Sequence, residues 1–383
     1  MIYDLYLENG YFSDYEYIQN GWINEVVSNR GNIYGYNPGS VYPDSYLCYN
    51  ATKVKELGLE DPSEMWFKGE WTWDNFDSWV KSSSEYLNSG EFVVDVRYAD
   101  FFIGTSASQG ARIANLTDYD RIYLNNNTPH LIVNNLKTYN EMGYLNNNRG
   151  LDDISNLFIQ GDSLLHNGST SILKALSNNS DVNFEVGIVP YPLKNDSIVT
   201  VYTEAYTYVD SLGNTVSINS PLKNRDGEVI KTSDGKDVYG IDLSNAKFYV
   251  PYTKVEFYGI MNYFHGNIND VDPSIAFNIL NDLMDKNAMI KKDNSLSNED
   301  LYRSSLNDFL VSSIDKEVVM SIKNNLYIDL IERFSFNATY YYAEENSLDY
   351  IIDDLITNNK DTYTILKETD DRYSQINGFI EGY

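Results

Sequence analysis

Short apolar runs alternate with amphipathic helix patterns along much of the chain, and this alternation limits the folds that it can adopt. The runs YLCYN (46–50), EFVVDVRY (91–98) and FEVGIVPYPL (184–193) are too short for ordinary helices, so we expect buried strands. Between them, PHLIVNNLKTYNEMG (129–143) has the spacing of an amphipathic helix that ends at a glycine. Strands that alternate with helices in this way predict an α/β fold.

Helix patterns dominate the end of the sequence. Residues 151–176 have the pattern of a helix, a strand and a second helix. Later helices are expected at 273–286, 298–313, 315–334, 346–358 and 361–380. The chain is therefore predicted to have a helical C-terminal region.

Residues 200–245 interrupt this order with a β-rich insertion. Val, Tyr and Thr alternate there, and the segments NRDGEV and SDGKDV each contain an Asp-Gly pair. An Asp-Gly pair between alternating residues is a strong signal for a β-hairpin, because both residues tolerate positive φ. We therefore expect a β-hairpin insertion here, and it is a candidate for interaction with another molecule.

The charge balance excludes whole classes of partner. The chain has 56 acidic and 28 basic residues, which gives a net charge of −28. Binding to nucleic acid needs clustered Lys and Arg, whereas the basic clusters here are short, such as Lys291-Lys292. No apolar run approaches the roughly 18 residues of a membrane span, and residues 1–22 show no signal-peptide pattern. We predict neither a nucleic-acid partner nor a membrane span.

The sequence lacks the common signatures of catalysis. Its three histidines do not have metal-ligand spacing, and no Gly-x-Ser-x-Gly or P-loop motif occurs. Cys48 is the only cysteine and lies in a predicted buried strand, which favours a core role over a reactive thiol. We therefore predict that the chain is not an enzyme and has no metal site and no cofactor. A glycan-active enzyme is a weaker alternative, which two carboxylates facing each other across a cleft would support.

The stretch KGEWTWDNFDSWVKSS (68–83) contains Trp71, Trp73 and Trp79, three of the five tryptophans. Thr72 is a candidate N-cap, and apolar residues at helical spacing follow it. The tryptophan rings either form a platform for a ligand or hold the helix to a core. We favour the core.

Several motifs between residues 31 and 199 follow one another in a recognisable order. GNIYGYNPGS and YLCYN precede a helix pattern that ends in LGL, and then come EDP and GEWTWDNF. Farther along lie LFIQGDSLLHNGS and FEVGIVPYPL, and DPSIAFNILNDLM follows much later. In this order the motifs resemble the carbohydrate-type extracellular solute-binding proteins of ABC importers. The resemblance is fairly specific over 31–199 and weak over 250–383.

This resemblance implies a two-lobed, periplasmic-binding-protein-like fold. Crossing strands join two α/β lobes in that family, and a ligand closes the hinge between the lobes. It also implies a carbohydrate held by aromatic faces and polar side chains.

The resemblance also implies candidate ligand-binding residues. Tyr49 occupies the Tyr position of the family's Tyr-Asn motif, and Asn167 begins its Asn-Gly turn. Many members have a sugar-stacking Trp just after that turn, where this chain has Ser171 and two other small polar residues. Tyr340 and Tyr341 belong to a late segment that either reaches the cleft or packs as part of a helix. These five residues form the predicted ligand site.

One lobe is shorter than the resemblance requires. Family members have several strands before the motif GNIYG, which begins here at residue 31. We therefore assign residues 1–45 and 246–290 to a remnant of the N-terminal lobe. The C-terminal-type α/β lobe is assigned to 46–199 and 291–383, and the β-hairpin insertion to 200–245. Another protein chain is a candidate to complete the shortened lobe.

Two functions follow from these features. The first is a non-catalytic, solute-binding-protein-like role at the cell surface, with a small molecule or an oligosaccharide bound in an interlobe cleft. The alternative is a structural or host-surface-binding protein of a bacteriophage virion that reuses the same fold. The order of the motifs favours the first, whereas the short lobe, the missing Trp and the added hairpin favour the second.

Overall fold

The structure is a computed structural model of the 383-residue chain. It describes residues 28–29, 32–33, 43–114, 122–147, 154–209, 215–252, 298–341 and 343–380. Internal contacts divide the chain into two compact units. Unit 1 comprises Met1–Val41 and Lys254–Leu306, and unit 2 comprises Tyr42–Thr253 and Asn307–Tyr383. The lobe boundaries given above stay predictions, and the helix expected at 273–286 lies outside the described residues.

The described part of unit 1 consists of short elements. Strands β1 (Ser28–Asn29) and β2 (Asn32–Ile33) pair with each other in antiparallel orientation. Helix α11 (Asn298–Ser305) begins where a helix was expected, but it is shorter than predicted. A 3₁₀ helix, η2 (Leu306–Asp308), follows it.

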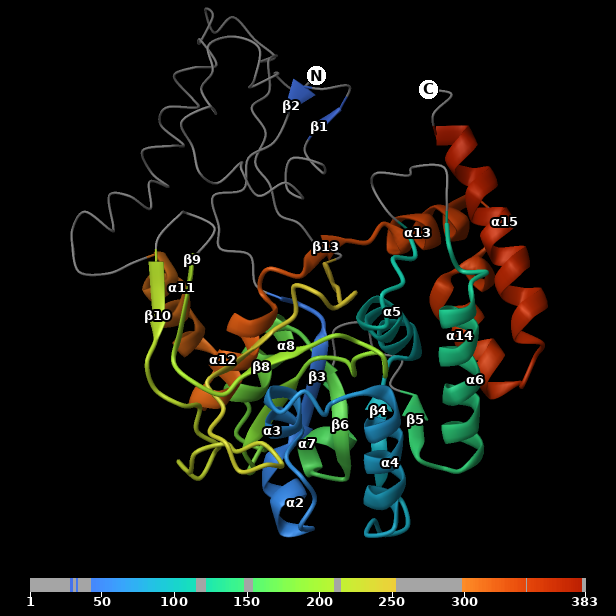
Figure 1. Ribbon diagram of the computed structural model, residues 1–383. Helices are drawn as coiled ribbons and strands as arrows, with labels where there is room; N and C mark the ends of the chain where they lie inside the picture. The colour runs from blue at the N-terminus through green and yellow to red at the C-terminus, as the bar shows by residue number, and fades with distance from the viewer. Residues whose placement is uncertain are drawn as a thin grey trace, which may run out of the picture. The chain divides into compact units, whose positions relative to one another are not determined.

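Unit 2 is built around a mixed five-stranded sheet with the order β5-β4-β6-β3-β7 (Figure 1). Its strands are β3 (Tyr46–Asn50), β4 (Phe92–Val96), β5 (Leu145–Asn147), β6 (Ser163–Gly168) and β7 (Val186–Val189). Strand β4 runs parallel to β5 and β6, whereas β3 runs antiparallel to β6 and β7. The three short apolar runs of the sequence are therefore strands, as predicted.

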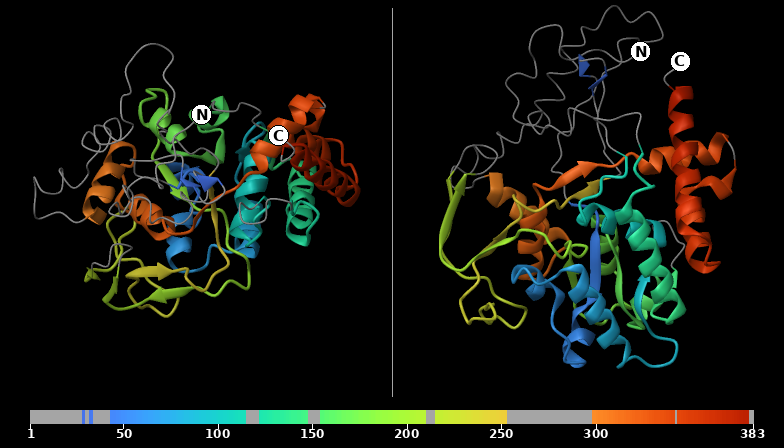
Figure 2. Two further views of the ribbon diagram at one scale, coloured as in Figure 1. Left: turned by 90° about the horizontal axis from the view of Figure 1, so that it is seen from above. Right: turned by 45° about the vertical axis from the view of Figure 1, so that its right-hand side comes forward.

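Helices cover this sheet. The first group is α2 (Ala51–Glu56), α3 (Pro62–Phe67), α4 (Trp73–Ser84), α5 (Tyr98–Ser108), α6 (Asn127–Glu141), α7 (Asn156–Gln160) and α8 (Thr170–Ser177). The second group is α12 (Ser313–Ile322), α13 (Ile331–Tyr341), α14 (Leu348–Thr357) and α15 (Thr362–Ile380), with the 3₁₀ helix η3 (Glu344–Asn346) between α13 and α14. Helix α4 packs on β4, and α3 and α12 pack on β7, while α14 and α15 pack against α6 (Figures 1 and 2). Because helices cover the sheet, every residue of β3 and β6 is buried.

The prediction of a single helix at 315–334 is wrong. The chain forms α12, then strand β13 (Leu326–Ile328), then α13. Strand β13 pairs in parallel with β12 (Val250–Tyr252), a segment far away in the sequence. A long-range pairing of this kind overrides a local helical pattern, and the local pattern gives no sign of it.

The tryptophan-rich segment is part of the core. Trp71, Trp73 and Trp79 expose only 0%, 8% and 5% of their surfaces. The indole N–H of Trp71 donates to the Pro190 carbonyl at 2.8 Å. The preference for a core role is confirmed. Thr72 stands at the N-cap position of α4 but makes no capping hydrogen bond with its side chain.

The predicted β-rich region contains two antiparallel strand pairs. Strand β8 (Thr200–Tyr202) pairs with β11 (Gly240–Asp242), and β9 (Tyr206–Val209) forms a hairpin with β10 (Thr215–Ile218). Between β10 and β11, each Asp-Gly pair closes a tight turn in which the glycine has positive φ, 81° at Gly227 and 82° at Gly235. We call residues 222–238, which contain both turns, the arm.

Cys48 lies at the centre of β3 and is fully buried. Burial raises the pKa of its thiol, which disfavours the reactive thiolate. The preferred core role of this cysteine is confirmed.

Candidate functional site

The carboxyl ends of three parallel strands meet at one edge of the sheet in unit 2. Arg97 follows β4, Asn147 ends β5, and Asn167 is the penultimate residue of β6. Helices α5 and α8 begin at this edge, and α13 lies beyond it (Figure 1). Ligands of open α/β sheets bind outside the carboxyl ends of the strands, so this edge is a candidate ligand site.

Asn167 connects this edge to its surroundings. Its Oδ1 accepts the backbone N–H of Arg97 at 2.6 Å, and its Nδ2 donates to the Tyr191 hydroxyl at 2.9 Å. Its carbonyl accepts from Nδ1 of His166 at 2.6 Å. Both ends of the Asn167 amide are therefore used to hold β4, β6 and the turn after β7 together. Its ligand-binding role stays a prediction.

Arg97 forms a charged cluster at the same edge. Its guanidinium contacts Asp100 at 2.7 Å, Glu332 of α13 at 3.9 Å, and Asp349 in the first turn of α14. The three carboxylates keep 35–40% of their side-chain surface exposed, while Arg97 keeps 13%. We call these four residues the edge cluster. Its carboxylate oxygens remain accessible from solvent, so they can accept hydrogen bonds from a hydroxylated ligand.

Helix α13 presents two aromatic rings one helical turn apart. Phe336 and Tyr340 expose 72% and 77% of their surfaces. At spacing i, i+4 they lie on the same face of the helix. The side chain of Tyr341 lies outside what the structure describes, so its predicted role is untested. Helix α13 therefore presents two ring faces on the described surface of unit 2.

Ser171 occupies the second position of α8 and is exposed. The preceding residues fix the start of this helix, because the Ser169 side chain accepts from the Ile172 N–H at 3.1 Å. Asp44 accepts from the Thr170 N–H at 2.7 Å. Ser171 thus lies at the carboxyl edge with Asn167, although no contact tests its predicted role.

Tyr49 lies elsewhere, inside the unit. It is fully buried, and its hydroxyl donates to Asp61 at 2.5 Å and accepts from Arg225 at 2.9 Å. Burial raises the pKa of this phenol well above its ordinary value, so it stays protonated. The structure does not bring Tyr49 together with Asn167 and Tyr340, and its predicted ligand role remains untested.

Two hollows open beside α4. One has a volume of about 200 Å³ and the other about 340 Å³, and Trp73, Leu131 and Asn195 line both. Asn195 accepts the backbone N–H of Asp74 at 2.9 Å and so caps α4 in place of Thr72. Because Trp73 shows only 8% of its surface, these hollows do not make it a stacking platform.

Sequence reasoning missed Arg97, Phe336 and Arg225. The position of Arg97 at the end of the predicted strand 91–98 was a usable signal, since strand ends carry ligand sites in α/β folds. Phe336 had no such signal, because a helical aromatic residue is more often part of the core.

Metal sites and membrane spans are absent among the residues that the structure describes. These residues contain no group of three or more His, Cys, Asp or Glu side chains that could hold a metal ion. In the same part of the chain, no helix is both long and apolar enough to cross a bilayer.

No protein-family model and no curated protein sequence matches the chain. Solved structures do match. The sugar-binding protein MalE from Xanthomonas citri aligns with a TM-score of 0.55 at 10% identity, over 94% of this chain and 74% of that one. An ABC substrate-binding protein from Listeria monocytogenes, solved with cycloalternan, gives a TM-score of 0.55 at 13% identity, over 93% of this chain and 74% of that one.

A third structure is a cyclo/maltodextrin-binding protein complexed with maltotetraose. It aligns with a TM-score of 0.52 at 14% identity, over 98% of this chain and 77% of that one. These likenesses confirm the predicted fold class: the chain has the two-lobed fold of sugar solute-binding proteins. Coverage of about three quarters of those chains agrees with one shortened lobe. All three are named as binding proteins.

Proposed function

We propose that this protein is a non-catalytic solute-binding protein for an oligosaccharide, acting outside the cell with an ABC importer. The observation that carries the proposal is the fold, which the chain shares with proteins described as binding sugars, cycloalternan and maltotetraose. At 10–14% identity these proteins share the fold with this chain, and the side chains that would contact a ligand are this chain's own.

The carboxyl edge of unit 2 offers the chemistry that a sugar requires. Phe336 and Tyr340 supply exposed ring faces, against which the apolar face of a pyranose can stack. The edge cluster supplies carboxylate oxygens that accept from sugar hydroxyls, and Ser171 supplies a hydroxyl. Asn167 acts in this proposal by holding the backbone at Arg97.

The phage alternative makes the opposite prediction for ligands. The stability of a structural protein that only reuses the fold does not change when sugar is added. A binding protein is stabilised by any ligand that prefers its folded state. Maltotetraose and cycloalternan at millimolar concentration are suitable probes, with thermal unfolding and calorimetric titration as measurements. If no oligosaccharide in a broad panel raises the Tm, the proposal is wrong and the alternative gains.

The aromatic residues give the sharper test. We expect Phe336→Ala and Tyr340→Ala each to weaken oligosaccharide binding about tenfold or more, because a stacked ring is lost. The Tm of the free protein should change little, since both rings are largely exposed. Tyr86→Ala is a matched control, because Tyr86 is 55% exposed but follows α4. Equal losses in all three variants would rule out α13 as the binding face.

A further inference from the structure

Arg225 of the arm is almost completely enclosed by other parts of unit 2, with only 10% of its side chain exposed. Its Nη2 lies 2.6 Å from Asp315 Oδ1, and its Nη1 lies 3.0 Å from Asp315 Oδ2. Nη1 also lies 2.8 Å from Glu185, and Nε lies 3.2 Å from Asp61. The guanidinium therefore uses all three of its nitrogens, and it holds Asp315 in the forked geometry that favours arginine over lysine.

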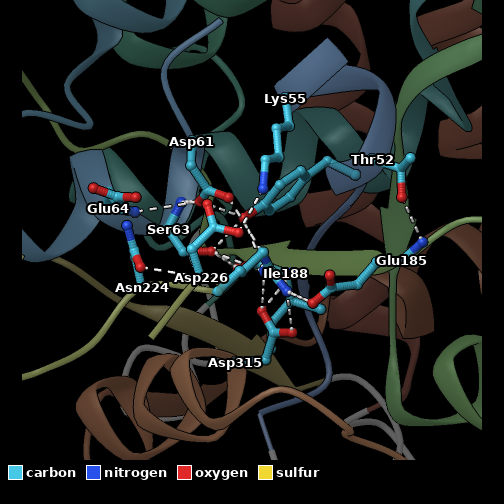
Figure 3. A network of polar contacts seen from close by, with 12 residues as sticks. Thr52, Lys55, Asp61, Ser63, Glu64, Glu185, Ile188, Asn224, Asp226 and Asp315 are labelled. Carbon is cyan, nitrogen blue, oxygen red and sulfur yellow. Dashed lines mark hydrogen bonds and ion pairs between the residues drawn. The ribbon is translucent and has the colours of Figure 1, made fainter. Parts of the chain in front are cut away.

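The groups that surround Arg225 come from four separate parts of the fold (Figure 3). Tyr49 belongs to β3, Ser63 to α3 and Asp315 to α12, while Asp61 precedes α3 and Glu185 precedes β7. The Tyr49 and Ser63 hydroxyls accept from Nη2 at 2.9 and 3.3 Å. The Tyr49 ring also lies beneath the guanidinium, with its centroid 5.3 Å from Cζ. These contacts form a complete shell of acceptors around one planar cation.

Gly187 of β7 leaves the space that the guanidinium fills. A Cβ atom at this position would lie 2.5 Å from Nη2 of Arg225 and 2.3 Å from the Tyr49 ring. Any side chain at residue 187 would therefore close the pocket. The φ of Gly187 is not in the left-handed region, so close approach rather than backbone conformation explains this glycine.

The pocket carries more negative charge than Arg225 neutralises. Among the described residues, the ion pairs of Asp61, Glu185 and Asp315 all go to Arg225. Asp315 exposes 2% of its side chain and also accepts the backbone N–H of Ile188 at 3.0 Å. A buried carboxylate that loses its cation is strongly unfavourable, so an empty pocket would attract any planar cation of suitable size.

We propose that unit 2 contains a guanidinium-binding pocket, formed by Tyr49, Asp61, Ser63, Glu185 and Asp315, which Arg225 fills as a ligand in cis. The side chain of Arg225 then anchors the arm to the core of the unit. This proposal is independent of the carbohydrate site, because it concerns different residues and a different ligand chemistry.

Chemical rescue tests the proposal on the full chain. Arg225→Ala should lower the Tm by roughly 10 °C, as expected for a broken buried ion pair in a unit of this size. Methylguanidinium at about 10 mM should restore part of that loss in a saturable way, because it binds the folded state only. Methylammonium and sodium chloride at the same ionic strength should not, since neither offers a planar fork.

The wild-type protein and Lys55→Ala serve as controls. The pocket is already occupied in both, so methylguanidinium should not raise their Tm. Lys55 pairs with Asp226 of the same arm, but that pair is exposed, with 70% and 52% of the side chains accessible. Removal of an exposed pair should cost little. An equal rise of the Tm in the wild-type protein would show a general salt effect and would overturn the proposal.

Trypsin cleavage provides a second measurement. Lys231 and Lys236 lie in the arm, and both are exposed. Cleavage after them should be at least tenfold faster in Arg225→Ala than in Lys55→Ala, and methylguanidinium should not slow it, because the free cation fills the pocket without holding the arm. If Arg225→Ala does not fold, Arg225→Lys should still show a saturable rise of the Tm with methylguanidinium. If the Tm does not rise with methylguanidinium in any Arg225 variant that folds, the proposal is wrong.

Discussion

Arg97 and Arg225 are each contacted by three carboxylates, yet they stand in very different surroundings. The partners of Arg97 expose 35–40% of their side chains. Among the partners of Arg225, Asp315 exposes 2% and Asp61 18%, whereas Glu185 at the rim exposes 47%. Arg97 directly follows a strand of the sheet, whereas Arg225 is brought in from an irregular arm.

This difference separates two uses of the same chemistry. Water competes for the carboxylates of the edge cluster, so each ion pair there contributes little to stability, and a ligand can replace it. Water is largely excluded from Asp61 and Asp315 in the Arg225 pocket, so these two carboxylates depend on the guanidinium. A count of ion pairs would treat the two clusters as equal, whereas the burial of Asp61 and Asp315 distinguishes them.

The largest expected effect comes from the buried carboxylate of the Arg225 pocket. We expect Asp315→Asn to lower the free energy of unfolding by about 3 kcal/mol, because an amide replaces the anion in the forked contact with Arg225. Urea unfolding followed by tryptophan fluorescence would measure this loss. Asp226→Asn is the control. Asp226 lies in the arm, and its ion pair with Lys55 is exposed. A loss below about 1 kcal/mol for Asp315→Asn would contradict the contrast between buried and exposed clusters.

An intermediate effect is expected from pH at the carboxyl edge. His166 exposes 2% of its surface, its Nε2 accepts the Ser155 N–H at 3.3 Å, and its Nδ1 donates to the Asn167 carbonyl. Burial lowers the pKa of His166, and the Asn167 carbonyl and Asp95 offset this only in part. The unfolded state therefore binds the proton more tightly. The stability that neutral His166 provides is present above about pH 6.5 and is lost as the pH falls below it.

The slope from this one residue is limited to about 1.4 kcal/mol per pH unit. Unfolding at pH 7.5, 6.5 and 5.5 would reveal it, with His166→Gln as the comparison. A Gln side chain can accept the Ser155 N–H, but it does not titrate in this range. If the variant and the wild-type protein show the same pH dependence, His166 is not the responsible group.

The smallest effect is expected at the edge cluster itself. Asp349→Asn removes a partner of Arg97 that is 40% exposed, so we expect a loss of less than about 1 kcal/mol. Thermal unfolding at low and high salt would measure it, and the loss should shrink further as salt is added. A loss as large as that of Asp315→Asn would show that exposure does not separate the two arginine clusters.

The elements that the sequence predicted well are those whose signal is local. YLCYN became β3 because a short apolar run between turns has few alternatives, and the segment around Trp73 became α4 by its helical spacing. Strand β13 could not be predicted in the same way, because its existence depends on pairing with β12. Thr72 illustrates the limit at the level of a single hydrogen bond, since the cap of α4 comes from Asn195.

The candidate sites show the same division. Asn167 and Ser171 were named from a motif, and both lie at the carboxyl edge, where sheet topology places the strand ends. Tyr49 was named in the same way, but the partner that determines its surroundings is Arg225. That arginine is separated from Tyr49 by 176 positions and sits in a turn sequence that predicts only a turn. No local pattern connects the two residues.

The burial of Cys48 has a practical consequence for solution experiments. Its sulfur is fully enclosed in β3, and the raised pKa of the thiol keeps it protonated, so the folded protein presents no thiolate that could attack a maleimide dye. Because it is the only cysteine in the chain, one new surface cysteine would be the only reactive thiol. A cysteine introduced at Ser171 could therefore carry a fluorophore that reports on the carboxyl edge, without prior removal of any native residue.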